Sequence, residues 1–165
     1  MHSENYLHQV REQYENFPYP ERNPDDEKHR LISASPDCLD KINYYCFEGK
    51  QSFNNNFRVL VAGGGTGDST IFLAEQLREY DAEIVHLDMT KASMDIAKQR
   101  ASVRKLNNIT WMHTSLLDLP DLDVGDFDYI NCSGVLHHLE SPQQGLAALN
   151  TCLLYTSPSP RDKTV

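Results

Sequence analysis

The sequence lacks the features that mark membrane-spanning, metal-binding or disulfide-stabilised proteins. No segment reaches the ~20 apolar residues that span a bilayer, and the N-terminus has no basic stretch followed by an apolar core. The four cysteines form no Cys-x-x-Cys pair and have no histidine at metal-ligand spacing, which favours free thiols over zinc or disulfides. We therefore expect no metal site, no membrane span and a cytoplasmic location.

Positive charge is also scarce. The 165 residues include 15 Lys and Arg against 24 Asp and Glu, which gives a net charge of −9. This balance argues against broad binding to a phosphate backbone, although a local basic groove for an RNA is compatible with it. A small molecule or a protein is slightly favoured as substrate. The length and the 39% apolar content predict one soluble α/β domain.

The rest of the chain is organised around residues 57–70, Phe-Arg-Val-Leu-Val-Ala-Gly-Gly-Gly-Thr-Gly-Asp-Ser-Thr. An apolar, β-branched run that breaks into glycines and enters a helical pattern predicts a buried parallel strand, a tight turn and a helix N-terminus. Glycines let the backbone bend sharply and approach a ligand, while a helix N-terminus offers free N–H groups and a positive dipole end. We expect a nucleotide-binding turn.

Residues 1–56 predict an N-terminal helical cap, or lid. Apolar residues at helical spacing predict a first helix over 3–16, which ends before the two prolines of 17–20. Asn-Pro-Asp at 23–25 starts a short second helix through residue 32, and Ser-Pro-Asp at 35–37 starts a third. A polar, Asn-rich linker covers 48–56. The aromatic side chains of this part are expected to be mainly core and lid contacts.

Residues 57–151 alternate between strand and helix patterns. Strands are predicted at 58–62, 84–87, 109–113 and 129–132, helices at 69–79, 91–103 and from about 141, and a loop at 116–126. This alternation predicts an α/β fold with a Rossmann-like, doubly wound parallel sheet of four strands.

The segment 152–165 departs from this order. Its run Cys-Leu-Leu-Tyr-Thr-Ser-Pro-Ser-Pro-Arg-Asp resembles the translation of an adapter used in sequencing libraries, so we expect a non-native tail and a natural sequence cut near Thr151. The last strands of the fold would then be missing. A genuine flexible Ser/Pro tail is the alternative.

The glycine turn fits a dinucleotide fingerprint poorly. That fingerprint requires Gly-x-Gly-x-x-Gly after a strand, and counting from Gly63 the third glycine position holds Asp68. A carboxylate there would repel a pyrophosphate and suit a nucleoside that carries a cationic or amino-bearing group. An NAD-dependent oxidoreductase is therefore a disfavoured alternative.

Three ordered segments resemble class I S-adenosylmethionine-dependent methyltransferases. Gly63-x-Gly65-x-Gly67 resembles motif I of that superfamily, and Asp88 closes the second strand about 20 residues past the turn, where an acid accepts hydrogen bonds from both ribose hydroxyls. Residues 127–139 include Ser-Gly-Val-Leu-His-His-Leu and are similar to the fourth-strand segment of the Val-Leu-His-His-Leu branch. The resemblance spans residues 57 to about 149.

The resemblance implies a binding site for S-adenosylmethionine. The turn backbone would lie against the methionine portion and ribose, Asp88 would hold the ribose, Met89 would pack on the adenine, and the Ser133 carbonyl would accept from the methionine ammonium. The implied cofactor-binding residues are Gly63, Gly64, Gly65, Gly67, Asp88, Met89, Ser115, Leu116, Asp118 and Ser133.

Some positions depart from the family pattern or can serve a second role. Many relatives carry an acid at the position of Val61, and an Asp at the position that aligns with Ser115. Ser115 can accept the adenine hydrogen bond with the Leu116 amide beside it, and Asp118 is the other candidate. Asp88 can alternatively cap the following helix, and Asp118 can be a turn residue.

The resemblance implies transfer of the sulfonium methyl group to a nucleophile by in-line displacement, with positioning and exclusion of water as the main contribution of the protein. His137 is the candidate base for an acceptor that must lose a proton. His137 and His138 are adjacent and are expected to point apart, which argues against a two-histidine metal site. A small-molecule acceptor is favoured, and a protein or tRNA is also permitted. The truncated chain is expected to be inactive, and a non-catalytic nucleotide-binding fragment is the main alternative.

Overall fold

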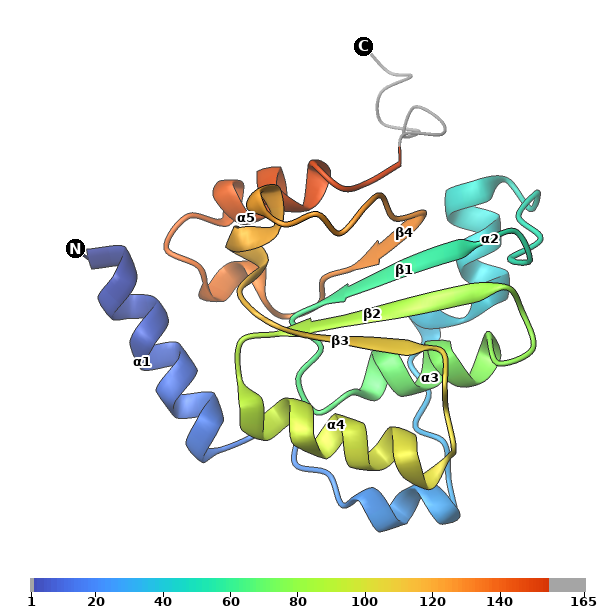
Figure 1. The fold of residues 1–165 in the computed structure, drawn as a ribbon, viewed down its shortest axis with the longest axis horizontal. Helices are drawn as coiled ribbons and strands as arrows, with labels where there is room; N and C mark the ends of the chain where they lie inside the picture. Colours follow the sequence, from blue (N-terminus) through green and yellow to red (C-terminus); the bar gives the residue numbers. More distant parts are fainter. Residues whose placement is uncertain (1, 155–165) are drawn as a thin grey trace.

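The structure is a computed structural model of the chain and describes residues 2–154. One sheet forms its centre, with four parallel strands in the order β3-β2-β1-β4 (Figure 1). The strands are β1 (Phe57–Ala62), β2 (Ala82–Asp88), β3 (Ile109–His113) and β4 (Tyr129–Asn131). The chain adds β2 and β3 on one side of β1 and then returns to add β4 on the other side. The order in which strands are added therefore reverses between β1 and β4. The predicted doubly wound, Rossmann-like α/β fold is confirmed.

Both faces of the sheet are covered by helices. On one face, α3 (Asp68–Gln76) packs against the first two strands together with α2 (Leu39–Phe47). On the other face, α5 (Pro142–Asn150) and the 3₁₀ helix η3 (Leu116–Asp121) complete a second core. The helix α4 (Lys91–Val103) lies beside α3. The central strands β1 and β2 contribute mainly apolar side chains to the two cores, because helices cover both faces of the sheet there.

The N-terminal part is helical, as predicted, but less regular. Helix α1 (His2–Asn16) matches the expected span, whereas the second and third predicted helices begin as the 3₁₀ turns η1 (Pro24–Lys28) and η2 (Ser35–Asp37). The Asn23 side chain caps η1 by accepting from the Asp25 N–H, as expected of an Asn-Pro-Asp start. The predicted helix through residue 32 is too long, since η1 ends at Lys28. Buried Glu27 within η1 pairs with Arg100 and Arg104.

Smaller differences occur elsewhere in the sheet domain. The predicted loop at 116–126 contains η3, and α3 ends three residues earlier than expected, at Gln76. No helix within residues 2–154 is long and apolar enough to cross a membrane.

The chain after α5 turns back toward the free edge of β4. Leu153 forms a parallel bridge with Phe127. The Phe127 N–H donates to the Cys152 carbonyl at 2.7 Å, and the Leu154 N–H donates to the Phe127 carbonyl at 2.8 Å. Within the described residues these contacts form no further strand. The predicted non-native tail over 152–165 therefore begins with three residues that contact the fold, and its remainder, 155–165, lies outside the described residues.

Candidate cofactor site

A cavity of about 460 Å³ lies at the carboxyl ends of the strands. The glycine turn, the ends of β2 and β4, and the segments after β3 and β4 form its walls, and α1 runs beside this end of the sheet (Figure 1). Open parallel sheets bind ligands at the point where the strand order reverses, and the reversal between β1 and β4 is at this cavity. The volume falls within the range of about 300–1,000 Å³ that is typical of small-molecule sites.

Most of the cofactor-binding residues expected from the sequence meet in this cavity. They are Gly63, Gly64, Gly65, Asp88, Met89, Ser115, Leu116 and Ser133, and the candidate base His137 lines it too. Two expected residues lie outside its lining. Gly67 is the N-cap of α3 and packs against α4, and Asp118 is exposed and accepts a hydrogen bond from the Thr114 hydroxyl at 2.9 Å.

The glycine turn has the conformation that its sequence requires. Gly63, Gly65 and Gly67 have φ values of 72°, 55° and 102°, a region that side chains with a Cβ rarely adopt. Gly64 is required for a different reason, because a Cβ there would lie 2.3 Å from Cε1 of buried His86. The turn is therefore held both by its backbone conformation and by the imidazole beneath it.

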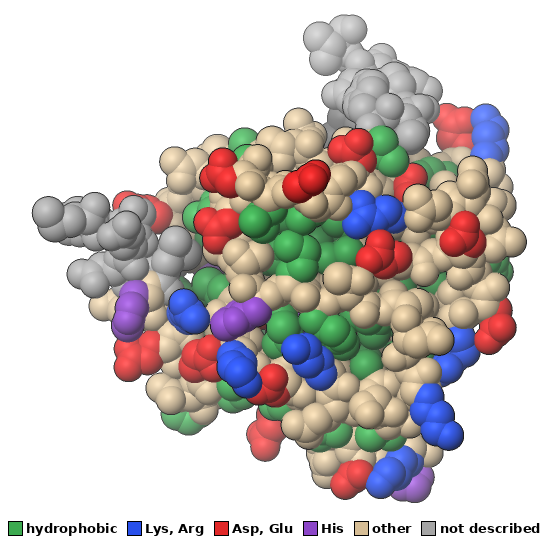
Figure 2. Space-filling view, viewed as in Figure 1, with side chains coloured by type: hydrophobic (Ala, Val, Ile, Leu, Met, Phe, Trp, Pro, Cys, Tyr) green, Lys and Arg blue, Asp and Glu red, His purple; other side chains and the backbone are tan. Residues whose placement is uncertain are grey.

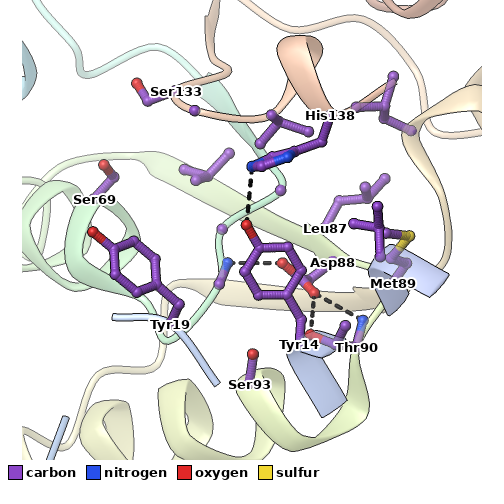
Figure 3. Close-up of a pocket in the computed structure, with 18 of the residues that line it drawn as sticks. Tyr14, Tyr19, Ser69, Leu87, Asp88, Met89, Thr90, Ser93, Ser133 and His138 are labelled. Atoms are coloured by element: carbon purple, nitrogen blue, oxygen red, sulfur yellow. Dashed lines mark hydrogen bonds between the residues drawn. The ribbon is translucent and has the colours of Figure 1, made fainter. Parts of the chain in front are cut away.

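Asp88 fixes the same turn from the end of β2 (Figure 3). Its Oδ2 accepts from the Gly65 N–H at 2.8 Å, and its Oδ1 accepts from the N–H and the hydroxyl of Thr90 at 2.8 and 2.6 Å. Asp88 thus supports the start of α4 and also lines the cavity. A carboxylate has about four acceptor sites, so one remains for a ligand in this arrangement.

The Asp68 carboxylate at the start of α3 is paired with two arginines. Both of its oxygens bind Arg22, at 2.9 and 2.7 Å, and Oδ1 also accepts from Arg100 at 2.8 Å. Burial opposes its ionisation, but these hydrogen bonds hold the pKa of Asp68 below its ordinary value. Two guanidinium groups therefore offset the negative charge from which repulsion of a pyrophosphate was expected.

The two histidines after β4 also differ from expectation. The rings of His137 and His138 do not point apart but lie together, with centroids 4.0 Å apart. The Tyr14 hydroxyl lies 2.9 Å from His138 Nε2, so α1 contacts the segment after β4 across the cavity (Figure 3). Burial is the main cause that lowers the pKa of His138, and the neighbouring His137 lowers it further. Burial raises the pKa of Tyr14. His138 is thus favoured in its neutral form near pH 7.

Other contacts at the site were only partly predicted. The Ser115 hydroxyl caps η3 by accepting from the Leu117 N–H at 3.2 Å, in addition to lining the cavity. Sequence reasoning did not single out Thr90 or Asn131, which also line it. Asn131 did have a signal, since it is a polar amide that follows Tyr and Ile in a short strand pattern.

Comparison with known proteins agrees with this geometry. The sequence profile of a family described as "Methyltransferase domain" matches residues 60–154, more than half of the chain. The chain belongs to this methyltransferase family. The matched part contains the glycine turn, Asp88 and the histidine segment, so the family resemblance seen in the sequence is confirmed.

Curated relatives match a little more than half of this chain. The chain is 44% identical over 93 residues to an uncharacterized protein of Synechococcus sp.. The aligned stretch covers 56% of this chain and 22% of that protein. The chain is 26% identical over 94 residues to the ubiquinone biosynthesis O-methyltransferase of Acinetobacter baylyi. The aligned stretch covers 57% of this chain and 38% of that protein. The chain thus spans well under half the length of these relatives.

Solved structures resemble the methyltransferase domain over a longer stretch. Magnesium protoporphyrin IX methyltransferase from Synechocystis, determined with bound SAM, matches with a TM-score of 0.62 and 19% identity over 90% of this chain and 72% of that one. PKMT2 from Rickettsia typhi, determined in complex with AdoHcy, matches with a TM-score of 0.57 and 27% identity over 79% of this chain and 24% of that one.

Proposed function

We propose that the chain binds S-adenosylmethionine in the cavity at the strand ends and serves in methyl transfer to a small-molecule acceptor. One observation carries this proposal. The glycine turn, Asp88 and the segment after β4 line a single cavity. Family membership and the two solved neighbours that hold SAM or AdoHcy agree with the cofactor predicted from the sequence.

The lining residues fit such a cofactor. Asp88 has one acceptor site left for a ribose hydroxyl, and Met89, Leu87 and Leu116 offer apolar surface on the β2 and β3 side for a base. None of the described residues that line the cavity is Lys or Arg, so the surroundings favour a cationic ligand over an anionic one. S-adenosylmethionine, when bound, supplies an activated methyl group on a sulfonium centre.

The protein contributes enclosure and orientation. Val10 and Tyr14 of α1 and the Tyr19–Pro20 segment cover the cavity from the N-terminal side, which excludes water from the reacting groups. For an acceptor that loses a proton, we propose His138 as the base, because burial favours its neutral imidazole and the Tyr14 hydroxyl at Nε2 holds the ring in place. His137, the residue expected from the sequence, lines the same wall.

The charge of the cavity favours a neutral small molecule over a tRNA as acceptor. A phosphate-rich acceptor requires basic residues near the reacting centre, and the lining residues include none among the described part of the chain. The name of the Acinetobacter relative, an O-methyltransferase of ubiquinone biosynthesis, is consistent with a small hydroxyl-bearing acceptor.

Calorimetric titration of the full chain with S-adenosylmethionine tests the proposal. We expect saturable binding, and we expect Asp88→Asn to weaken it roughly tenfold or more because a hydrogen bond from the ribose to a charged acceptor is lost. Asp121→Asn, an exposed carboxylate at the end of η3, is the matched control and should leave the affinity unchanged.

Three results separate the alternatives. No heat with millimolar cofactor would overturn the binding proposal. Binding of NADH in its place would support the oxidoreductase alternative. Release of AdoHcy is then followed with hydroxyl and amine acceptors, and cofactor binding without any turnover would support a fragment that only binds nucleotide.

A further inference from the structure

Two aromatic side chains are left in solvent just after α1. Phe17 is 74% exposed and Tyr19 is 70% exposed. Single apolar side chains on a protein surface are common and need no explanation. Tyr19 differs from a scattered surface residue because it also lines the cavity at the strand ends. Its ring therefore stands at the border between this cavity and the solvent.

The main chain at Tyr19 is fixed although the side chain is exposed. The Pro20 carbonyl accepts from the Thr66 hydroxyl at 2.6 Å. The Tyr19 carbonyl comes so close to the glycine turn that a Cβ on Gly65 would lie 2.7 Å from it. The segment is thus attached to the turn by backbone groups, and the largely exposed Tyr19 ring is not needed for this attachment. A side chain on such a fixed backbone loses little freedom when a ligand binds to it.

The Tyr19 ring faces the part of the cavity that holds the proposed base. In Figure 3 the Tyr19 ring lies beside Tyr14, with its hydroxyl on the side of Ser69. Burial is the main cause that raises the pKa of Tyr14, and the nearby Tyr19 and Asp88 raise it further. The two phenols therefore share one space. Since the Tyr14 hydroxyl lies 2.9 Å from His138 Nε2, a molecule against Tyr19 is on the side of the cavity where Tyr14 and His138 meet.

The chemistry of this part of the cavity favours a flat, uncharged ring. The face of a tyrosine is a π surface that stacks on planar groups and offers a large contact area at low entropic cost. The cavity lining contains no Lys or Arg among residues 2–154, and the hydroxyl-bearing residues Ser69 and Ser133 line it together with the aromatic ones. A few polar groups in a mainly apolar site orient a small molecule. A planar ring with a hydroxyl substituent matches both features.

We propose that Tyr19 binds the methyl acceptor by stacking on a planar ring, with the acceptor hydroxyl directed toward Tyr14 and His138. This inference rests on the proposed function. Tyr19 is then a residue that determines specificity, because its ring favours planar acceptors over saturated ones of the same size. Cofactor binding does not depend on this ring.

Two alcohols with the same carbon skeleton test the proposal. 2-Naphthol is planar, whereas decahydro-2-naphthol carries the same hydroxyl on a saturated, puckered ring system. Calorimetry on the full chain saturated with S-adenosylhomocysteine gives the dissociation constant of each. We expect 2-naphthol to bind more tightly. Tyr19→Leu should weaken 2-naphthol roughly three- to tenfold and leave the affinities for decahydro-2-naphthol and S-adenosylhomocysteine unchanged.

Two further variants separate stacking from general effects of substitution. Tyr19→Phe keeps the ring and should retain the affinity for 2-naphthol. Tyr45→Leu is the matched control, because Tyr45 of α2 is 72% exposed and lies outside the cavity lining, and it should change none of the affinities.

The outcomes distinguish this inference from the proposed function. Equal binding of the two alcohols by the unmodified chain, no binding of 2-naphthol, or a Tyr19→Leu effect on both alcohols or on neither overturns the inference and leaves the proposed function intact. Weaker binding of S-adenosylhomocysteine in Tyr19→Leu would assign the ring to the cofactor and also overturn it. Failure of S-adenosylhomocysteine to bind the unmodified chain overturns the proposed function itself.

Discussion

His86 is a fully buried imidazole beneath the glycine turn. Its Nδ1 lies 2.7 Å from the Thr70 hydroxyl, and its ring packs beside Trp111 with centroids 5.0 Å apart. Burial lowers the pKa of His86 to about 4. The folded state therefore favours the neutral imidazole, while the unfolded chain takes up a proton near pH 6.5.

This shift predicts a pH-dependent stability. Because the folded pKa lies below the unfolded one, the contribution of His86 is fully present above pH 6.5 and is lost as the pH falls from 6.5 toward 4. The free energy of unfolding should fall in this window by about 1.4 kcal/mol per pH unit for this one proton. Urea titrations from about pH 4 to 7 measure it. His86→Gln should remove that part of the slope, and an unchanged slope would contradict the assignment.

Gly64 and His86 should be energetically coupled. A Cβ on Gly64 would lie 2.3 Å from the ring, so Gly64→Ala should destabilise the fold by about 1–3 kcal/mol through overpacking. In a His86→Ala background the same change should cost much less, since the ring that it meets is gone. A double-mutant cycle of unfolding free energies gives the coupling, and additive effects would show that the two residues are independent.

At the scale of elements, α1 is attached to the sheet domain by few but specific contacts. The Glu15 carboxylate accepts from the N–H groups of Lys91 and Ala92 at 2.7 and 3.0 Å and so caps α4 in place of a side chain of α4 itself. Burial opposes ionisation of Glu15, but these backbone hydrogen bonds lower its pKa. The Tyr14 contact with His138 lies one residue away.

Removal of this cap should loosen α1. Glu15→Ala should cost about 0.5–2 kcal/mol, the usual loss for a helix cap, and speed hydrogen exchange in both α1 and the first turn of α4. Glu12→Ala, on the exposed side of the same helix, is the matched control. Faster exchange confined to α1 would mean that Glu15 does not cap α4.

The segment after α1 is held by a network of charges and hydrogen bonds. The Thr66 hydroxyl donates to the Pro20 carbonyl at 2.6 Å, Arg22 pairs with Asp68, and Glu27 pairs with buried Arg100. Gly65 has no room for a Cβ because the Tyr19 carbonyl would lie 2.7 Å from it. The N-terminal part thus packs directly on the glycine turn and forms part of the cavity wall.

At the scale of the whole molecule, the charge distribution disfavours nucleic acid. The net charge is −9, and on the face shown in Figure 2 acidic side chains dominate the upper half, while basic and acidic ones are mixed below. In a gel-shift titration near ~150 mM salt, we expect no binding of a tRNA at micromolar concentrations of the chain. Binding that weakens steeply with added salt would instead support an RNA acceptor.

The sequence by itself determined the fold class and the location of the site. Strand, turn and helix patterns are local, because they depend on apolar periodicity and on the φ angles that glycine permits, so residues 57–113 predicted β1 to β3 and the turn between β1 and α3 closely. The family resemblance implied that Asp88, Ser115 and Ser133 share one cofactor site, and in the structure they line one cavity.

Only the tertiary structure decided which side chains act together. Tyr14 meets His138 across 124 positions, Asn131 meets Asp37 across 94, and Arg22 meets Asp68 across 46. No local pattern encodes such pairs, because they depend on how the N-terminal segments pack over the ends of the strands. The same packing brings Arg22 and Arg100 to Asp68, and the sequence alone predicted neither contact. It also brings Asn131 of β4 into the cavity lining, and sequence reasoning had singled out no side chain of that strand.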